Sequence, residues 1–169
     1  MLLIKIFWAF LTFLPFFGAV LAANDCPVMW TDATHAGLGC LFFETSQNMT
    51  WEEAQVFCTT LHLGSYLVEI KNEKHQDYLE MKMYEIDEIT ESKRDWWIGL
   101  TDKDSEGHWL WFHSGKEATY THWVEGEPKP GKLLTYAYMS RGMTHKGQWH
   151  VTTAENSKFP ICQYSNWSS

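Results

Sequence analysis

Residues 97–111 of the 169-residue chain read WIGLTDKDSEGHWLW. Aromatic and β-branched residues at its two ends favour short strands, from Trp96 to Leu100 and from Trp109 to Phe112. Between them, the segment from Thr101 to His108 is rich in turn-forming residues. The stretch therefore predicts two strands separated by a polar turn region.

The segment before this stretch predicts a helix, a strand and a second helix. Residues 50–53, Thr-Trp-Glu-Glu, form a capping box for the first helix. Cys58 belongs to the residues that recur there at helical spacing and so predict the buried face: Trp51, Ala54, Cys58 and Leu61. A strand is expected from Ser65 to Ile70, and Asn72 is expected to cap the second helix.

The segment after it predicts a long loop and three strands. From Gly115 to Lys132 the chain holds glycines and prolines without a sustained period, which is typical of a structured loop. Strands are expected from Thr135 to Met139, from Gln148 to Val151 and from Phe159 to Tyr164. A proline cannot donate to a strand ladder, so Pro160 predicts an edge or a bulge in the last strand.

The N-terminal residues 1–22 predict a signal peptide. Lys5 precedes an almost uncharged run, and Val20-Leu21-Ala22 fits a cleavage site after Ala22. The rival interpretation is a membrane anchor, but the run is shorter than the roughly 20 apolar residues that a spanning helix needs. We therefore expect a secreted chain, residues 23–169, with one domain and no membrane span.

Four cysteines in an oxidising compartment suggest two disulfides, and four cysteines permit three pairings. The spacing favours a local bridge between Cys26 and Cys40, which leaves Cys58 with Cys162. Two sequons begin at Asn48 and Asn166, and both are expected glycosylation sites where they are exposed on the surface.

The charge is acidic overall but uneven. The chain has 13 Lys and Arg against 21 Asp and Glu, which disfavours binding to nucleic acid. Between Pro128 and His150, however, there are only basic charges: Lys129, Lys132, Arg141 and Lys146. A local positive face and a merely solvated loop both remain open at this point.

The order of the motifs resembles that of the C-type lectin-like domain. The matching motifs are the four cysteines, WIGL at 97–100, TDKDSEGHWLW at 101–111, WVEGEP at 123–128, QW at 148–149 and PIC at 160–162. Over residues 26–164 the resemblance implies an α+β fold with two helices, two small antiparallel sheets and a long loop region that carries the ligand site. It supports the favoured disulfide pairing, with Cys26–Cys40 as the N-terminal bridge of the longer members. It also implies that six tryptophans belong to the core: Trp51, Trp97, Trp109, Trp111, Trp123 and Trp149.

Sugar-binding members of that family hold a calcium ion with Glu-Pro-Asn or Gln-Pro-Asp in the loop and Trp-Asn-Asp in the next strand. Here Glu127 keeps its carboxylate, but Lys129, His150 and Val151 replace the other ligands. Calcium takes six to eight oxygen ligands, and these three side chains offer none. We therefore expect no primary calcium site and no cofactor. Asp102 and Glu106 match an accessory calcium position of some members, yet two carboxylates fall well short of a calcium shell.

Two functions follow from the resemblance. The first is a secreted lectin that binds glycans without the primary calcium, with a preference for anionic or microbial-surface glycans and a role in innate immunity. Its expected ligand-binding residues are Glu127, Lys129, Lys132, Arg141, Lys146 and His150. The alternative is a module that keeps the fold and binds a receptor or another secreted protein. No enzyme is expected, because the sequence has no nucleophile elbow or phosphate loop and its cysteines are expected to be bridged.

Overall fold

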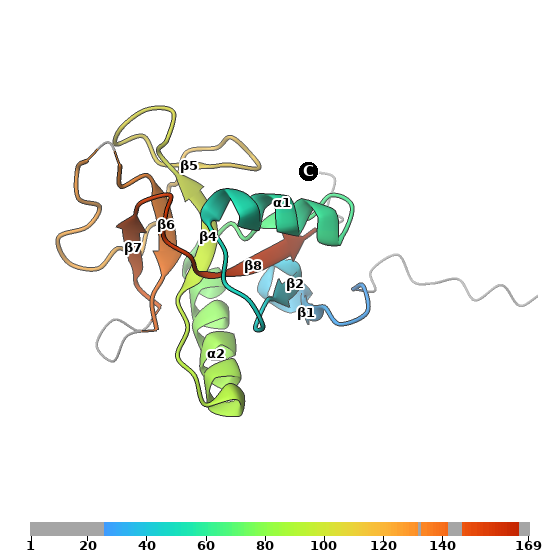
Figure 1. Cartoon of the computed structure of the whole chain (residues 1–169). Helices are drawn as coiled ribbons and strands as arrows, with labels where there is room; N and C mark the ends of the chain where they lie inside the picture. The colour runs from blue at the N-terminus through green and yellow to red at the C-terminus, as the bar shows by residue number, and fades with distance from the viewer. Residues whose placement is uncertain (1–25, 132, 142–146, 166–169) are drawn as a thin grey trace, which may run out of the picture.

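The computed structural model describes residues 26–131, 133–141 and 147–165 (Figure 1), so the predicted signal peptide lies outside the described part. The α+β class is confirmed. The elements in chain order are β1 (Thr31–Ala33), η1 (Thr34–Ala36), β2 (Gly39–Phe43), α1 (Trp51–Leu61), β3 (Tyr66–Leu67), α2 (Glu73–Thr90), β4 (Trp96–Thr101), β5 (Leu110–Trp111), β6 (Tyr136–Met139), β7 (Trp149–Thr152) and β8 (Phe159–Tyr164).

The strands form one mixed sheet with the order β1-β2-β8-β4-β6-β7, while β3 pairs with β8 and β5 pairs with β4. Two antiparallel groups, expected as two small sheets, are joined where β4 runs parallel to β8. Pro160 therefore lies in a central strand, and the expectation of an edge or bulge is wrong. The proline is tolerated because it is the second residue of β8, and the antiparallel ladder with β2 begins one residue later, at Ile161.

Both helices begin as their capping residues predict. The Thr50 side chain accepts the N–H of Glu53, and the Glu53 carboxylate accepts the N–H of Thr50 at 2.8 Å, which completes the capping box of α1. At α2, the Asn72 side chain accepts the N–H of His75 at 3.0 Å. These caps satisfy amide groups that have no partner inside a helix.

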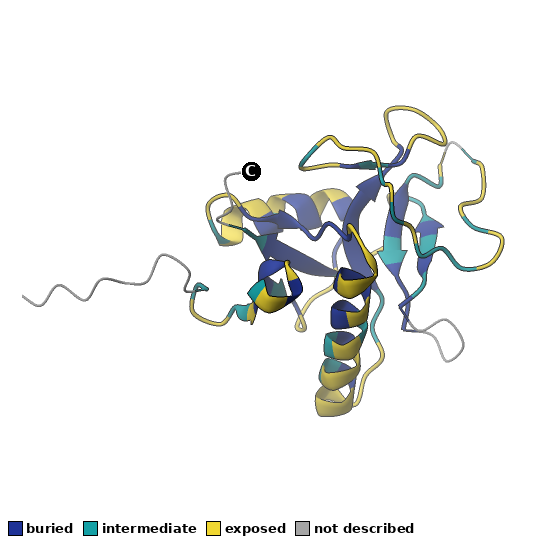
Figure 2. Ribbon diagram, turned by 180° about the vertical axis from the view of Figure 1, so that it is seen from behind, coloured by how far each residue is buried: buried dark blue, intermediate teal, exposed yellow. Residues whose placement is uncertain are grey.

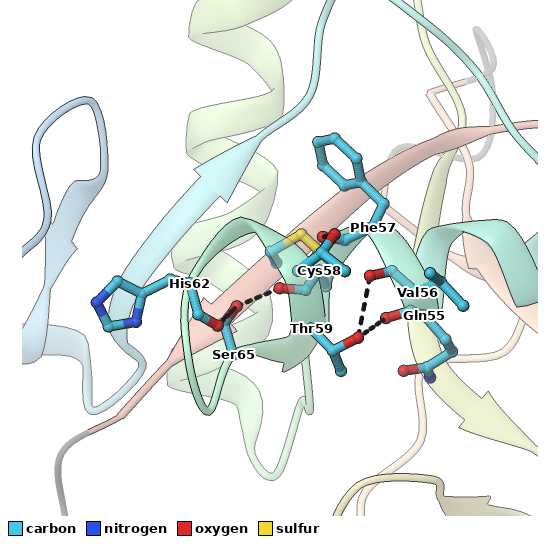
Figure 3. Close-up of a disulfide and its surroundings, with 9 residues drawn as sticks. Gln55, Val56, Phe57, Cys58, Thr59, His62 and Ser65 are labelled. Atoms are coloured by element: carbon cyan, nitrogen blue, oxygen red, sulfur yellow. Dashed lines mark hydrogen bonds between the residues drawn. A yellow bond between two sulfur atoms is a disulfide. The ribbon is translucent and has the colours of Figure 1, made fainter.

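The disulfides join Cys26 to Cys40 and Cys58 to Cys162, as the spacing favoured. The second bridge ties the buried face of α1 to β8, and Figure 3 shows its surroundings. Next to it, the Ser65 hydroxyl donates to the carbonyl oxygens of Cys58 and His62, which fixes the turn after α1.

The core holds the tryptophans that were assigned to it. Trp123 is partly buried against the cluster that contains Trp149. The other five are buried: Trp51, Trp97, Trp109, Trp111 and Trp149. Buried residues follow the sheet, while the loops are mostly exposed (Figure 2). β6, β7 and the long loop lie at the end of the domain away from the places where the described chain begins and ends (Figures 1 and 2). Across the described ranges, no helix combines the length and the apolar character that crossing a membrane requires.

Candidate functional site

Trp149 fixes the strand on which His150 lies. Its ring packs edge-on against Trp111, Tyr120 and Trp123, at centroid distances of 5.5–6.0 Å. Its indole N–H donates to the side-chain oxygen of Gln76 on α2 at 2.9 Å. Because side chains alternate along a strand, burying Trp149 directs His150 to the opposite face of β7.

Gln76 also holds the start of β7 against α2. Its amide nitrogen donates to the Gly147 carbonyl at 2.7 Å and to Glu80 at 2.7 Å. Gly147 has a φ of +71°, and a Cβ atom added to it would lie 2.3 Å from the Glu80 side chain. The positive φ favours glycine at this position, and a side chain there would also have to displace that of Glu80.

The long loop is tied to the same strand. The N–H of Val124 donates to the Trp149 carbonyl, and the N–H of Glu127 donates to the Val124 carbonyl, both at 3.0 Å. The peptide bond between Glu127 and Pro128 is cis. These contacts place the Glu127 carboxylate beside β6 and β7.

Lys129 turns back onto Glu127. One carboxylate oxygen of Glu127 accepts the backbone N–H of Lys129 at 2.8 Å, and the other lies 3.7 Å from the Lys129 ammonium nitrogen. The Lys129 side chain is 67% exposed, whereas that of Glu127 is 9% exposed. The loop therefore presents an exposed ammonium group whose counter-charge sits just beneath it.

Tyr138, which the sequence analysis did not select, completes this face. Its ring stacks on His150 at a centroid distance of 5.3 Å, and the Lys158 ammonium lies 4.1 Å from its centroid. Burial, with the nearby carboxylates of Asp95 and Glu127, raises the pKa of Tyr138 to about 12. The phenol is therefore protonated at neutral pH and able to donate a hydrogen bond.

We call Glu127, Lys129, Tyr138 and His150 the loop face. Tyr138 could have been found from the register, since it is directly opposite His150 in the β6–β7 pair. The sequence predicted both strands but not which residues face each other across them.

Arg141 does not belong to the loop face, which corrects its assignment as a ligand-binding residue. Its side chain is 8% exposed, and its Nε donates to the Asp87 carboxylate on α2 at 2.7 Å. The guanidinium group also lies over the Tyr84 ring. A cation that is buried and paired inside the domain is not available to an external ligand.

Several other predicted residues are placed as follows. Asn48 is exposed, as a glycosylation site requires. Lys132, Lys146 and Asn166 lie outside the described residues, so their predictions stay untested.

Both accessory calcium candidates accept backbone amides. Asp102 is 4% exposed and accepts the N–H of Gly107 at 2.8 Å, and Glu106 accepts the N–H of Gly131 at 2.8 Å. Burial raises the pKa of Asp102 above its ordinary value. Within the described ranges, no three acidic, histidine or cysteine side chains come together as metal ligands.

The donor set of the loop face does not fit calcium. Glu127 is the one carboxylate at the positions that match the family's calcium ligands, and it is already engaged by Lys129. Val151 is buried and carries no oxygen in its side chain, while His150 lies against Tyr138. A hard cation needs several more oxygen ligands than this face offers.

Comparison with known proteins gives the family. Residues 47–164 match the Lectin C-type domain. The chain is 33% identical over 129 residues to the low affinity immunoglobulin epsilon Fc receptor of Mus musculus, covering 76% of this chain but 34% of the receptor, so it spans about a third of that relative's length. It is 28% identical over 155 residues to a C-type lectin of Micrurus corallinus, covering 90% of this chain and 93% of that one.

A solved structure agrees with these sequence matches. The C-type lectin CEL-I from Cucumaria echinata superposes with a TM-score of 0.72 and 27% identity, over 84% of this chain and 99% of CEL-I. The family match covers well over half of the chain. The chain belongs to the C-type lectin domain family.

Proposed function

We propose that this protein is an extracellular lectin that binds carbohydrate at the loop face without calcium. The observation that carries the proposal is the ion pair between Glu127 and Lys129, in which an ammonium group lies where a calcium-dependent member would have a further oxygen ligand. Family membership and relatives described as C-type lectins support carbohydrate as the ligand class. The predicted signal peptide, the two disulfides and the exposed sequon at Asn48 support secretion and glycosylation.

The loop face offers what sugar hydroxyls need. The Lys129 ammonium and the Tyr138 hydroxyl are donors, and the Glu127 carboxylate is an acceptor. Hydrogen bonds to charged groups contribute more than bonds between neutral groups, about 1.5–3 kcal/mol each. All four cysteines are bridged, so no thiol nucleophile is present, and we propose binding rather than catalysis.

A preference for anionic or microbial-surface glycans, and with it a role in innate immunity, rests on Lys132 and Lys146. Of the basic residues expected at this site, Lys129 is paired with Glu127 and Arg141 with Asp87. The loop face, which includes neither Lys132 nor Lys146, therefore carries little net positive charge. Neutral glycans are the simpler ligands for it.

The test is binding of the full chain, secreted from eukaryotic cells, to an array of neutral and anionic glycans in calcium and again in EDTA. We expect binding that survives EDTA and falls about tenfold or more in Lys129→Glu, because a charge-assisted hydrogen bond is lost. Lys93→Glu is the matched control, since Lys93 is exposed and lies outside the loop face. Binding that disappears in EDTA would refute the proposal.

The second candidate is a protein-binding module. Leu133 is 76% exposed next to the long loop, and one relative is described as a receptor for immunoglobulin. Burying this exposed apolar side chain against a protein partner would be favourable. This function would be favoured if the chain bound no glycan on the array but captured a secreted protein, and if Leu133→Asp abolished that capture.

A further inference from the structure

A second polar pocket lies on a different part of the domain from the loop face. It has a volume of about 260 Å³, and it lies between the end of β8, the start of α2 and the turn after β5. The lining residues that matter for its chemistry are Tyr66, Glu69, Lys71, His75, His113 and Lys116. None of them belongs to the loop face.

The floor of this pocket is a buried, preorganised carboxylate. The Glu69 side chain is 1% exposed. One of its oxygens accepts the N–H of Ser114 at 2.9 Å, and the other lies 3.0 Å from the Lys71 ammonium nitrogen. The Glu69 backbone N–H donates to the side chain of Gln163 on β8 at 3.0 Å. Glu69 therefore holds Lys71 at the pocket and offsets one positive charge.

Lys116 supplies a second positive charge that is not offset. It is exposed and lines the same pocket. Among the described residues, no carboxylate lies within ion-pair distance of its ammonium group. With Lys71 balanced by Glu69, the pocket has a net charge of about +1 at neutral pH, on a chain whose formal net charge is −8.

The ring of His75 adds a neutral donor. His75 is 7% exposed, and its Nδ1 accepts the N–H of Lys71 at 3.3 Å, so the proton of the neutral ring is on Nε2. Burial lowers the pKa of His75, which keeps the ring neutral at physiological pH. Gly37 has a φ of +88°, and a Cβ atom on it would lie 3.3 Å from this Nε2, so the glycine leaves room beside the ring.

His113 forms the wall of the pocket. Its ring is parallel to that of Tyr66, with centroids 3.7 Å apart and an interplanar angle of 2°. The Tyr66 hydroxyl is hydrogen-bonded to the Ser165 hydroxyl at 3.0 Å, which fixes the pair. A rigid ring pair next to two ammonium groups gives the pocket a defined shape as well as a charge.

We propose that this pocket binds a small oxyanion, a carboxylate or a sulfate group. Lys71 and Lys116 supply the charge, and the imidazole of His113 supplies an N–H donor. The oxyanion comes either from free inorganic sulfate or from the acidic group of a saccharide. The site is independent of the loop face, so it stands whether or not the loop face binds neutral sugar.

The test is an NMR titration of the full mature chain that follows the imidazole signals of His113 and His75. The probes are sodium sulfate and N-acetylneuraminate, with galactose as the neutral control, at constant ionic strength. We expect saturable shifts of the His113 signals with both anions and none with galactose. The apparent affinity is expected to fall about tenfold or more in Lys116→Glu and to stay unchanged in Lys93→Glu.

The two sources of the oxyanion are separated by comparing the probes. N-acetylneuraminate that binds about tenfold or more tighter than sulfate indicates an acidic saccharide, whereas equal or stronger sulfate binding indicates a free oxyanion. Lys116→Gln guards against a folding defect in the charge-reversed variant, and it is expected to weaken both probes less than Lys116→Glu. Shifts that are linear with anion concentration and identical in all variants would overturn the site. Lys129→Glu is expected to leave these shifts unchanged, so failure of this site and failure of the loop face can be told apart.

Discussion

The half of the domain near the chain ends and the half that carries the long loop are held together by different chemistry. In the first half, one disulfide joins Cys26 to β2 and the other joins α1 to β8. β6, β7 and the loop have no disulfide, since all four cysteines of the sequence are used in the first half. They rely on the rings around Trp149 and on the buried pair of Arg141 with Asp87.

The comparison shows how a binding face stays in place without a cross-link. Trp149 and Gln76 fix β7 to α2, and Arg141 adds a contact between the end of β6 and the last turns of the same helix. α2 is thus the support on which the loop half rests. Substitutions that remove these contacts with α2 are expected to unfold the loop half. Substitutions at the exposed loop face are expected to alter only ligand binding.

The largest effect is expected from removing the bridge that spans most of the domain. Cys58 and Cys162 are 104 residues apart, whereas Cys26 and Cys40 are 14 apart. On the chain-entropy model, Cys58→Ala with Cys162→Ala should lower the free energy of unfolding by about 4–5 kcal/mol, against about 3 kcal/mol for the N-terminal pair. Urea unfolding of both double variants measures the difference. Equal losses would contradict the dependence on loop length.

The next effect tests the support of the loop half. Asp87→Ala leaves the Arg141 guanidinium buried without a counter-charge, which should lower the free energy of unfolding by about 3–5 kcal/mol. Lys82→Ala is the control, because its ion pair with Glu85 lies on the exposed side of α2 and such pairs contribute about 0–1 kcal/mol. Urea unfolding of the two variants gives the comparison. If both lost the same stability, the distinction between a buried and an exposed pair would be wrong.

The smallest effect is a pH dependence from Asp102. Burial raises its folded-state pKa above the ordinary value of 3.8, so the native chain holds this proton more tightly than the unfolded chain does. The stability of the wild type attributable to Asp102 therefore falls as pH rises from below 3.8 through the raised pKa. Asp102→Asn keeps an acceptor for the Gly107 N–H and cannot ionise.

We expect the Asp102→Asn variant to be more stable than the wild type at neutral pH, with the advantage shrinking as pH is lowered toward 3.8. Urea unfolding at a series of pH values measures it. A variant that is less stable than the wild type at neutral pH, and only in the presence of calcium, would show instead that Asp102 holds an ion.

Local signals predicted most of the elements. The capping box at Thr50 and the cap at Asn72 fixed the starts of both helices, because each needs only a side chain and an amide three residues away. The strand predicted from Ser65 to Ile70 is shorter than expected, Tyr66–Leu67. Beyond Leu67, the backbone of Val68 bonds to Ile161 and Gly99, and that of Glu69 to a side chain, so no regular ladder continues. None of these partners is visible from the local sequence.

Residue type, spacing and motif order predicted the disulfide pairing and the tryptophan core, which the structure confirms, and the loss of the primary calcium ligands, which stays a prediction. Which charged side chains are paired inside the domain, and which are open to a ligand, is visible only in the tertiary structure. Arg141 forms an ion pair with Asp87, 54 residues away in the sequence. The Glu69 carboxylate accepts the backbone N–H of Ser114, 45 residues away. Charge pairing depends on distance through space and on burial, and neither is encoded in the spacing along the chain.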